Sequence, residues 1–376
     1  MAIQLFKPQY EVEECLNEIR KCLECGWTGL GYKTVEFEER WKEYTGLPNA
    51  HYLNSSTIGL NLAVEILKEH YGWSDGDEII TTPITFVSTN HAILKSRLNA
   101  VFADIDETMC LNPESVLQNI TPRTRAVMYV GIGGNCGNLN RIIEICRRYK
   151  LRLILDAAHM AGTRYNGIIP GKEADVVVYS FQAVKNLPTA DSGMICFMKK
   201  ELDEIVRKKT WLGISKDTYL RTQNEGKYKW KYDVEYVGEK GHGNSVMASI
   251  GIVQLKYLDR DNIYRRELCD CYRAQFEKYK DKIKMVRIED GCESSCHLFQ
   301  ICVDNREKLI DDLNKNGVYP GVHYYANTNY RMYKYAQNKC AFSDYVSDHT
   351  VSLPLHLGLT HEDVQSISEI VIDSVN

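Results

Sequence analysis

The sequence has no long hydrophobic run and no excess of charge of one sign. Nowhere in its 376 residues do about 18 apolar residues follow one another, so no segment resembles a membrane-spanning helix. The 46 basic side chains are balanced by 50 acidic ones, and a net charge of −4 does not favour binding to nucleic acid or to anionic membranes. Residues 1–20 contain Lys7, Glu11 and Glu13 where a signal peptide has an apolar core. We therefore expect a cytoplasmic protein with neither a membrane nor a nucleic-acid partner.

The thirteen cysteines do not form a recognisable framework. Their number is odd and they are scattered along the chain, which favours reduced, mostly buried thiols over disulfides. The pairs Cys22-x-x-Cys25 and Cys292-x3-Cys296 each resemble half of a zinc site. Neither has a second pair or a suitably spaced pair of histidines, so we expect no bound metal.

The region from residue 50 to about residue 200 alternates short β-rich runs with stretches of helical length. This alternation is typical of an α/β fold with a mainly parallel sheet covered by helices. Helices are expected to begin near Thr57, Val87, Asn112 and Asn138. The seven strand candidates are Ala50–Asn54, Glu78–Thr81, Ala100–Asp104, Ala126–Val130, Arg152–Leu155, Val176–Phe181 and Met194–Phe197.

The second part of the chain has a different pattern, typical of a smaller α+β domain. Residues 228–244 are rich in Tyr, Lys and Gly without a clear period, which indicates a loop. We place the domain boundary after it, with a large domain at residues 1–245 and a small one at residues 246–376. The small domain is expected to contain a long helix from Val246 to about Lys282, a strand at Leu298–Val303, a helix at Arg306–Asn316 and a closing helix after Thr360.

Two neighbouring strands end in residues that can carry chemistry. The first leads to Asp156 and His159, and the second leads to Ser180 and Lys185. In open α/β sheets ligands bind at the carboxyl ends of strands, so these side chains are expected to converge. Taken alone, the acid could be a helix cap and the lysine could be solvated. The apolar neighbours of Lys185 favour partial burial, which lowers the pKa of a lysine and suits Schiff-base chemistry.

A third segment, Leu53-Asn54-Ser55-Ser56-Thr57, joins a strand to a helix through hydroxyl residues. The N-terminus of a helix binds phosphate well, although an ordinary Ser/Thr cap is the competing interpretation. The three segments together fit one ligand, with a phosphate at the Ser56 turn, a ring beside Asp156 and an aldehyde on Lys185. That ligand is pyridoxal phosphate (PLP).

At these residues the sequence resembles the DegT/DnrJ/EryC1/StrS family of fold-type I PLP enzymes, best known as sugar aminotransferases. The resemblance covers nearly the whole chain and follows the order of the family's motifs. It implies an aspartate aminotransferase-like fold. The matching segments are Gly26-Trp27, Val35-Glu-Phe-Glu38, Asn54-Ser-Ser-Thr57, Gly76-Asp-Glu-Ile-Ile80, Pro83-Ile-Thr-Phe86, Asp156-Ala-Ala-His159, Ser180-Phe-Gln-Ala-Val-Lys185, Gly251-Ile-Val-Gln-Leu255, Val322-His-Tyr324 and Leu353-Pro-Leu-His356.

The resemblance also implies a role for each site residue. Lys185 would bind the cofactor covalently and then shuttle a proton, Asp156 would pair with the pyridine nitrogen, and His159 would lie by the ring hydroxyl. Phe86 would stack on the ring, unless it is a core aromatic. The phosphate would be held by Ser56, Thr57, Ser180 and, from the partner subunit of a homodimer, Lys240. The acceptor pocket would include His323 and Tyr324, which could equally be structural.

Some positions depart from the family pattern. Ser56 stands where glycine is usual, and Gln182 stands where histidine is common. These residues flank the cofactor and acceptor sites, so they bear on substrate identity more than on reaction type. One subgroup has histidine in place of the lysine and removes a sugar hydroxyl, and Lys185 argues against that chemistry.

The resemblance therefore predicts a homodimeric aminotransferase that alternates between PLP and pyridoxamine phosphate (PMP). Glutamate is the expected amino donor, and the expected acceptor is a nucleotide-linked keto-deoxy sugar for surface polysaccharide synthesis. The alternatives are the same transfer to a small phosphorylated ketone or a keto-cyclitol, and a PLP-binding regulatory protein without turnover. A nicotinamide dehydrogenase would need a G-x-G-x-x-G turn, which the segment after Asn54 lacks.

Overall fold

The structure is a computed structural model of the chain and describes residues 2–215 and 232–376. Its centre is a seven-stranded sheet of order β1-β8-β7-β5-β4-β2-β3. All neighbouring strands are parallel except where β8 pairs with β1 and β7, which confirms the predicted α/β class and the large mainly parallel sheet. The strands are β1 His51–Leu53, β2 Glu78–Thr81, β3 Asn99–Phe102, β4 Thr124–Val130, β5 Arg152–Asp156, β7 Val176–Ser180 and β8 Gly193–Phe197.

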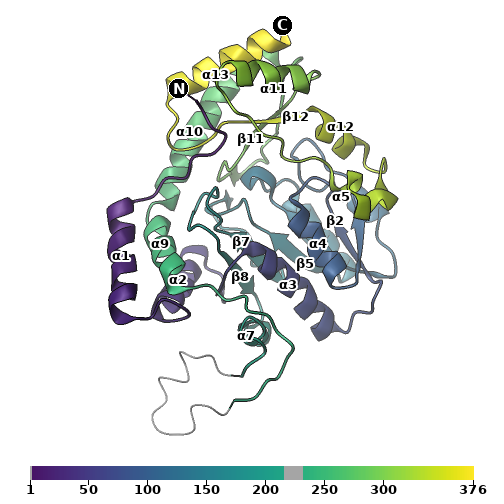
Figure 1. Ribbon diagram of the computed structural model, residues 1–376. Helices are drawn as coiled ribbons and strands as arrows, with labels where there is room; N and C mark the ends of the chain where they lie inside the picture. The colour runs from purple at the N-terminus through teal and green to yellow at the C-terminus, as the bar shows by residue number, and fades with distance from the viewer. Residues whose placement is uncertain (1, 216–231) are drawn as a thin grey trace.

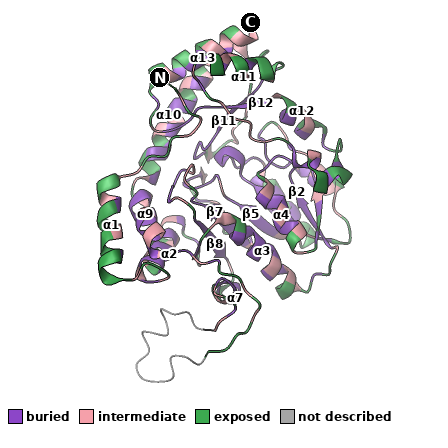
Figure 2. Cartoon of the chain, in the orientation of Figure 1, coloured by how far each residue is buried: buried purple, intermediate pink, exposed green. Residues whose placement is uncertain are grey.

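Helices cover both faces of this sheet (Figure 1). The strand residues alternate between the two layers. On β7, Val176 and Val178 pack against one layer, while Val177 and Tyr179 pack against the other. Because both faces are covered, every residue of β7 is buried (Figure 2). The first layer is α3 Ser56–Tyr71, α4 Val87–Lys95 and α7 Lys200–Lys209; the second is α2 Tyr32–Thr45, α5 Pro113–Gln118, α6 Leu139–Tyr149 and α9 Ser245–Leu255.

The helix ends follow local signals in the sequence. The Ser55 hydroxyl accepts the backbone N–H of Ile58 at the start of α3, and Gly72 ends that helix with a φ of 66°. The Asn112 side chain caps α5 ahead of Pro113. The helices predicted near Thr57, Val87, Asn112 and Asn138 are therefore confirmed within a residue of their predicted starts.

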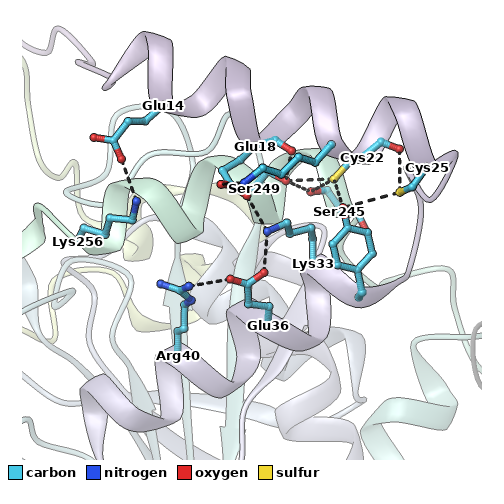
Figure 3. A network of polar contacts seen from close by, with 12 residues as sticks. Glu14, Glu18, Cys22, Cys25, Lys33, Glu36, Arg40, Ser245, Ser249 and Lys256 are labelled. Atoms are coloured by element: carbon cyan, nitrogen blue, oxygen red, sulfur yellow. Dashed lines mark hydrogen bonds and ion pairs between the residues drawn. The ribbon is translucent and has the colours of Figure 1, made fainter.

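An N-terminal helix that the sequence patterns did not predict, α1 Val12–Cys25, lies against α9 (Figure 3). Lys33, 6% exposed, pairs with Glu18 of α1 and Glu36 of α2 at 2.7 Å each. The thiol of Cys22 lies 3.2 Å from the Ser249 hydroxyl, so it takes part in packing between α1 and α9. Within the described ranges, no group of three or more His, Cys, Asp or Glu side chains is placed to hold a metal ion.

A second, smaller core surrounds a three-stranded antiparallel sheet of order β12-β11-β9. The N-terminal segment joins this core, since Ile3 bridges to Val318, and both chain ends lie at this side of the molecule (Figure 1). The elements are β9 Lys284–Met285, β11 Phe299–Cys302, β12 Thr350–Leu353, α10 Leu258–Phe276, α11 Arg306–Lys315, α12 Ala341–His349 and α13 His361–Val375. A separate two-stranded antiparallel sheet pairs β6 Arg164–Tyr165 with β10 Cys292–Glu293.

The single long helix predicted from Val246 to Lys282 is wrong. The helical run is interrupted at Lys256 and Tyr257, whose backbone N–H groups bond to the carbonyls three residues back, so α9 and α10 are separate helices. A short 3₁₀ turn follows α10 after Phe276. The two helices have different neighbours, since α9 lies against α1 and α2 and α10 lies against α13. The strand at Leu298–Val303, the helix at Arg306–Asn316 and the closing helix are confirmed.

The predicted boundary between residues 245 and 246 stays a prediction, and α9 contributes Ala248 and Ile252 to the larger core. Of the predicted loop at 228–244, residues 228–231 lie outside the described residues. The rest runs back beside β1, where His242 bridges to Leu53. No helix in the described part of the chain combines the length and the apolar character needed to cross a bilayer.

Candidate active site

A cavity of about 740 Å³ lies at the carboxyl ends of β5 and β7, between the sheet and the smaller core. Its volume is within the range of small-molecule sites. Parallel strands present their carboxyl ends at one edge, which is why residues distant in sequence meet here. Every predicted site residue except Lys240 lines this cavity: Ser56, Thr57, Phe86, Asp156, His159, Ser180, Lys185, His323 and Tyr324.

Lys185 follows β7 and extends its amine into the cavity. The Nζ atom lies 3.3 Å from Nε2 of His297. The surrounding protein disfavours the charged form, and this desolvation lowers the pKa of Lys185 to about 8, partly opposed by the negative charge of Asp156. At pH 7 about a tenth of these side chains is therefore a neutral, nucleophilic amine, far more than for an ordinary lysine.

Asp156 is the last residue of β5 and is 3% exposed. Its Oδ2 accepts the hydroxyl of Thr89 at 2.8 Å, and its Oδ1 accepts the backbone N–H of Ala158 at 3.1 Å. Burial raises the pKa of this carboxyl, while these two hydrogen bonds oppose the rise. No ion pair joins Asp156 to a cation among the residues that the structure describes, and a buried carboxylate of this kind is suited to a cationic nitrogen of a ligand.

His159 is a neutral hydrogen-bond donor in this structure. Its Nδ1 accepts the backbone N–H of Gly133 at 3.2 Å, so the ring proton belongs on Nε2. Nε2 lies 3.2 Å from the hydroxyl of Tyr324. Burial, and then the charge of Lys185, hold the pKa of His159 well below its usual value. The ring can thus donate one hydrogen bond into the cavity, as a glutamine amide would.

The turn before α3 brings hydroxyls and a helix N-terminus to one side of the cavity. Ser55 makes the capping hydrogen bond, while Ser56 and Thr57 form the first turn of the helix and line the cavity. A Cβ on Gly193 would lie 2.7 Å from the backbone nitrogen of Ser56, so glycine is required where β8 passes this turn. The buried Ser180 at the end of β7 lines the same cavity. This end of the cavity suits an anion.

The aromatic and histidine residues of the cavity wall come from both cores. Phe86 is 58% exposed and its ring lies 6.3 Å from that of Tyr324, so it is not the core aromatic that the sequence left open. His323 lies with its Nδ1 2.9 Å from the Ser352 hydroxyl. Burial, and then the charge of Lys185, lower the pKa of His323 to about 4.

Lys240 lies outside the cavity of its own chain. Its exposed amine is 5.0 Å from the centre of the Trp211 ring. The backbone of this segment lies beside the phosphate-side turn. The backbone carbonyl of Lys240 accepts the side-chain amide of Asn54 at 3.0 Å, and the carbonyl of Gly241 accepts the backbone N–H of Asn54 at 2.9 Å. The expected contact of Lys240 with a partner subunit's cofactor stays a prediction.

Three residues of the site were not predicted from the sequence: Thr89, Asn186 and His297. Thr89 stands one helical turn after Phe86, a spacing that could have indicated a common face. Asn186 directly follows Lys185, and its amide oxygen lies 3.0 Å from Nδ1 of His297. His297 precedes a strand of the smaller core, and its contact with Lys185 spans 112 positions of the chain, for which the sequence holds no local signal.

The donor set of this cavity fits PLP. A lysine amine with a lowered pKa, a buried carboxylate, a helix N-terminus suited to an anion and an exposed aromatic ring line one space. These are the groups that an aldehyde, a pyridine nitrogen, a phosphate and a ring face require.

Comparisons with known proteins agree with this chemistry. The sequence profile of the DegT/DnrJ/EryC1/StrS aminotransferase family matches residues 9–372. The spore coat polysaccharide biosynthesis protein SpsC of Bacillus subtilis is 32% identical over 377 residues, covering 96% of this chain and 95% of the relative. The dTDP-4-dehydro-2,3,6-trideoxy-D-glucose 4-aminotransferase of Saccharopolyspora spinosa is 29% identical, covering 98% and 95%. The structure of Streptococcus pneumoniae Spr1654 in its PMP form superposes with a TM-score of 0.90 at 26% identity, covering 98% of each chain.

Proposed function

The chain belongs to the DegT/DnrJ/EryC1/StrS aminotransferase family, and on that premise we propose that it transfers an amino group from glutamate to a nucleotide-linked keto-deoxy sugar. The chain is a PLP-dependent aminotransferase of a family of sugar aminotransferases. The observation that carries the proposal is the convergence of Lys185, Asp156 and the N-terminus of α3 on one cavity.

We assign the holding of the cofactor to residues from four parts of the large core. Lys185 binds the aldehyde, Asp156 pairs with the pyridine nitrogen, and the neutral His159 donates from Nε2 to the ring hydroxyl. Phe86 covers one face of the ring. The phosphate is held at the start of α3 and the end of β7, by Ser56, Thr57 and Ser180. Once bound, the pyridine ring accepts the electrons left when the Cα proton of the donor departs.

The protein's own contribution to the transfer is proton movement at Lys185. Because its pKa is lowered to about 8, the amine is available as a base near neutral pH. With the cofactor bound, Nζ would accept the Cα proton of the amino donor and give it up again within the same half-reaction, so the lysine would end as it began. Thr89 and Ala158 hydrogen-bond to the two oxygens of Asp156, which favours its charged form against the effect of burial on its pKa.

The substrate assignment is supported by the relatives. One relative's name identifies a dTDP-linked 4-keto sugar as its acceptor, and another's places it in spore coat polysaccharide synthesis. The aromatic wall of the cavity, with Phe86, Tyr324, Tyr325 and Tyr330, offers apolar faces that suit a sugar ring or a base. His323 and Tyr324 stand on the side of the smaller core and are the residues we assign to the acceptor pocket.

We further propose a cytoplasmic homodimer in which each site is completed by Lys240 of the other subunit. The support is the position of this segment, since the backbone of Lys240 lies beside the phosphate-side turn while Lys240 does not line the cavity of its own chain. A second phosphate contact from a partner would place a further positive charge at the anion end of the site.

The proposal is tested by offering the purified enzyme glutamate with two acceptors in parallel: a nucleotide-linked 4-keto-6-deoxy sugar and dihydroxyacetone phosphate. We expect amino sugar from the first and no amine from the second. Transfer to dihydroxyacetone phosphate alone would replace the substrate assignment. The donor is tested separately by isotope exchange between glutamate and 2-oxoglutarate. If no label is exchanged, glutamate is not the amino donor.

A further inference from the structure

His297 brings a second nitrogen base to Lys185. It comes from the smaller core, just before β11, and is 3% exposed. Its ring is stacked on Phe6 at 5.4 Å with an interplanar angle of 7°, and Nε2 lies 3.3 Å from Nζ of Lys185. The imidazole therefore has a fixed plane and one edge directed at the reacting amine.

A chain of hydrogen bonds fixes which nitrogen of His297 carries the proton. The amide nitrogen of Asn262 donates to the carbonyl of Ala161 at 2.9 Å, so its oxygen must face Asn186. The amide nitrogen of Asn186 donates to that oxygen at 2.7 Å and to the carbonyl of Ser295 at 2.6 Å.

These contacts leave the oxygen of Asn186 facing Nδ1 of His297 at 3.0 Å. An amide oxygen only accepts hydrogen bonds, so Nδ1 must carry the proton. In a neutral imidazole the other nitrogen then has a free lone pair. Nε2 of His297 is thus an acceptor aimed at Nζ of Lys185.

The surroundings keep this imidazole neutral. Burial is the main cause that holds the pKa of His297 well below its usual value, and the nearby charge of Lys185 adds to it. The ring of His159, centred 4.4 Å away, is neutral for the same reasons. The other charged group that faces Lys185 is Asp156, whose carboxylate acts on the amine and favours its protonated form.

We propose that His297 is a further catalytic residue of the amino transfer, one that accepts a hydrogen bond from Nζ of Lys185 and so directs the lone pair of the amine toward the substrate. Asn186 is a positioning residue that acts through His297 by fixing its tautomer. His297 takes up no proton itself, because the Cα proton moves to Nζ and from there to the cofactor carbon. This inference rests on the proposed role of Lys185.

The test is the pH dependence of covalent cofactor capture. The full chain, freed of cofactor, is mixed with PLP at a series of pH values, and the rate of covalent bond formation is followed by absorbance. Only the neutral amine reacts, so the midpoint reports its pKa. Ionisation of free PLP is the same for every variant and cancels in comparisons.

His297→Phe keeps the ring and its stacking on Phe6 but removes the acceptor. An acceptor favours the ammonium form of lysine, so its loss should lower the midpoint by about one pH unit. His297→Leu provides a second variant without an acceptor should His297→Phe fail to fold. His297→Gln, whose oxygen can accept while its nitrogen donates to Asn186, should keep the wild-type midpoint.

Asn186→Leu should move the midpoint in the same direction but less far, because the freed imidazole can adopt either tautomer. Combined with His297→Phe it should add no further shift, since both act on one contact. The matched control is His70→Phe, a change of an exposed histidine on α3, which should have no effect.

A wild-type midpoint in folded His297→Phe or His297→Leu, judged by circular dichroism, would overturn the inference while leaving Lys185 in its role. A wild-type chain that captures no PLP would overturn the proposed role of Lys185 and this inference with it.

Discussion

The hydroxyl of Thr89 on α4 donates a 2.8 Å hydrogen bond to the carboxylate of Asp156 at the end of β5. Thr89→Val keeps the shape of the side chain but removes this donor, so the pKa of Asp156 rises further and the carboxylate pairs less well with the pyridine nitrogen. A hydrogen bond to a charged group contributes about 1.5–3 kcal/mol, so cofactor affinity should fall about 10- to 100-fold. Equilibrium titration of the two proteins with PLP measures this difference in cofactor affinity.

Thr89→Ser is the control for that prediction, because serine retains the donor and should bind the cofactor about as well as the wild type. Equal affinity in Thr89→Val would show that the threonine has no part in holding the charge of Asp156.

The stability of the protein should fall in acid because the cavity buries neutral histidines. The pKa of His323 is lowered to about 4 from an unfolded value near 6.5, so below pH 6.5 the unfolded chain binds a proton that the folded chain does not. This part of the free energy of unfolding is present above pH 6.5 and is lost as the pH falls to about 4. His159 and His297 act in the same direction.

Urea denaturation of the wild type and of His323→Gln between pH 4 and pH 7 isolates this contribution. The stability of the variant should depend on pH less steeply, by up to about 1.4 kcal/mol per pH unit between pH 6.5 and 4. Parallel curves for the two proteins would contradict the assignment of His323 as a buried neutral group.

Phe86 is 58% exposed, so its truncation should affect the binding of the cofactor and not the fold. Phe86→Ala should weaken PLP binding by about 3- to 10-fold, corresponding to the roughly 0.5–1.5 kcal/mol of an aromatic pair, with an unchanged melting temperature. Phe86→Tyr should bind normally. A loss of thermal stability without loss of affinity would point to a structural role.

The shared-site proposal is tested by complementation between two inactive variants. Lys185→Ala removes the lysine that binds the cofactor, and Lys240→Ala removes the proposed phosphate contact. In a dimer of one subunit of each kind, one active site carries both substitutions and the other carries neither. Mixing the two proteins under conditions of subunit exchange should therefore restore activity. If Lys240 served its own chain, every site of the mixture would carry a defect and activity would stay absent.

The large sheet could be predicted because its strands are short apolar runs buried on both faces, as Val176-Val-Val-Tyr of β7 illustrates. The site followed from the sheet, since Asp156 ends one strand and Lys185 lies in the segment after its parallel neighbour. His297 could not be predicted, because it reaches Lys185 only through the packing of the smaller core against the sheet. The interruption at Lys256 and Tyr257 was missed because neither residue is a helix breaker, so the sequence holds no local signal for it.

The central claim is that Lys185 holds PLP and that the enzyme accepts an amino group from glutamate. The most direct measurement is the visible absorption spectrum of the purified protein before and after addition of glutamate, with Lys185→Ala and the exposed control Lys278→Ala alongside. We predict a yellow wild type and a yellow control that lose their long-wavelength band with glutamate, and a Lys185→Ala protein that never shows the band of the covalently held cofactor. A colourless wild type that takes up no added PLP would contradict the account.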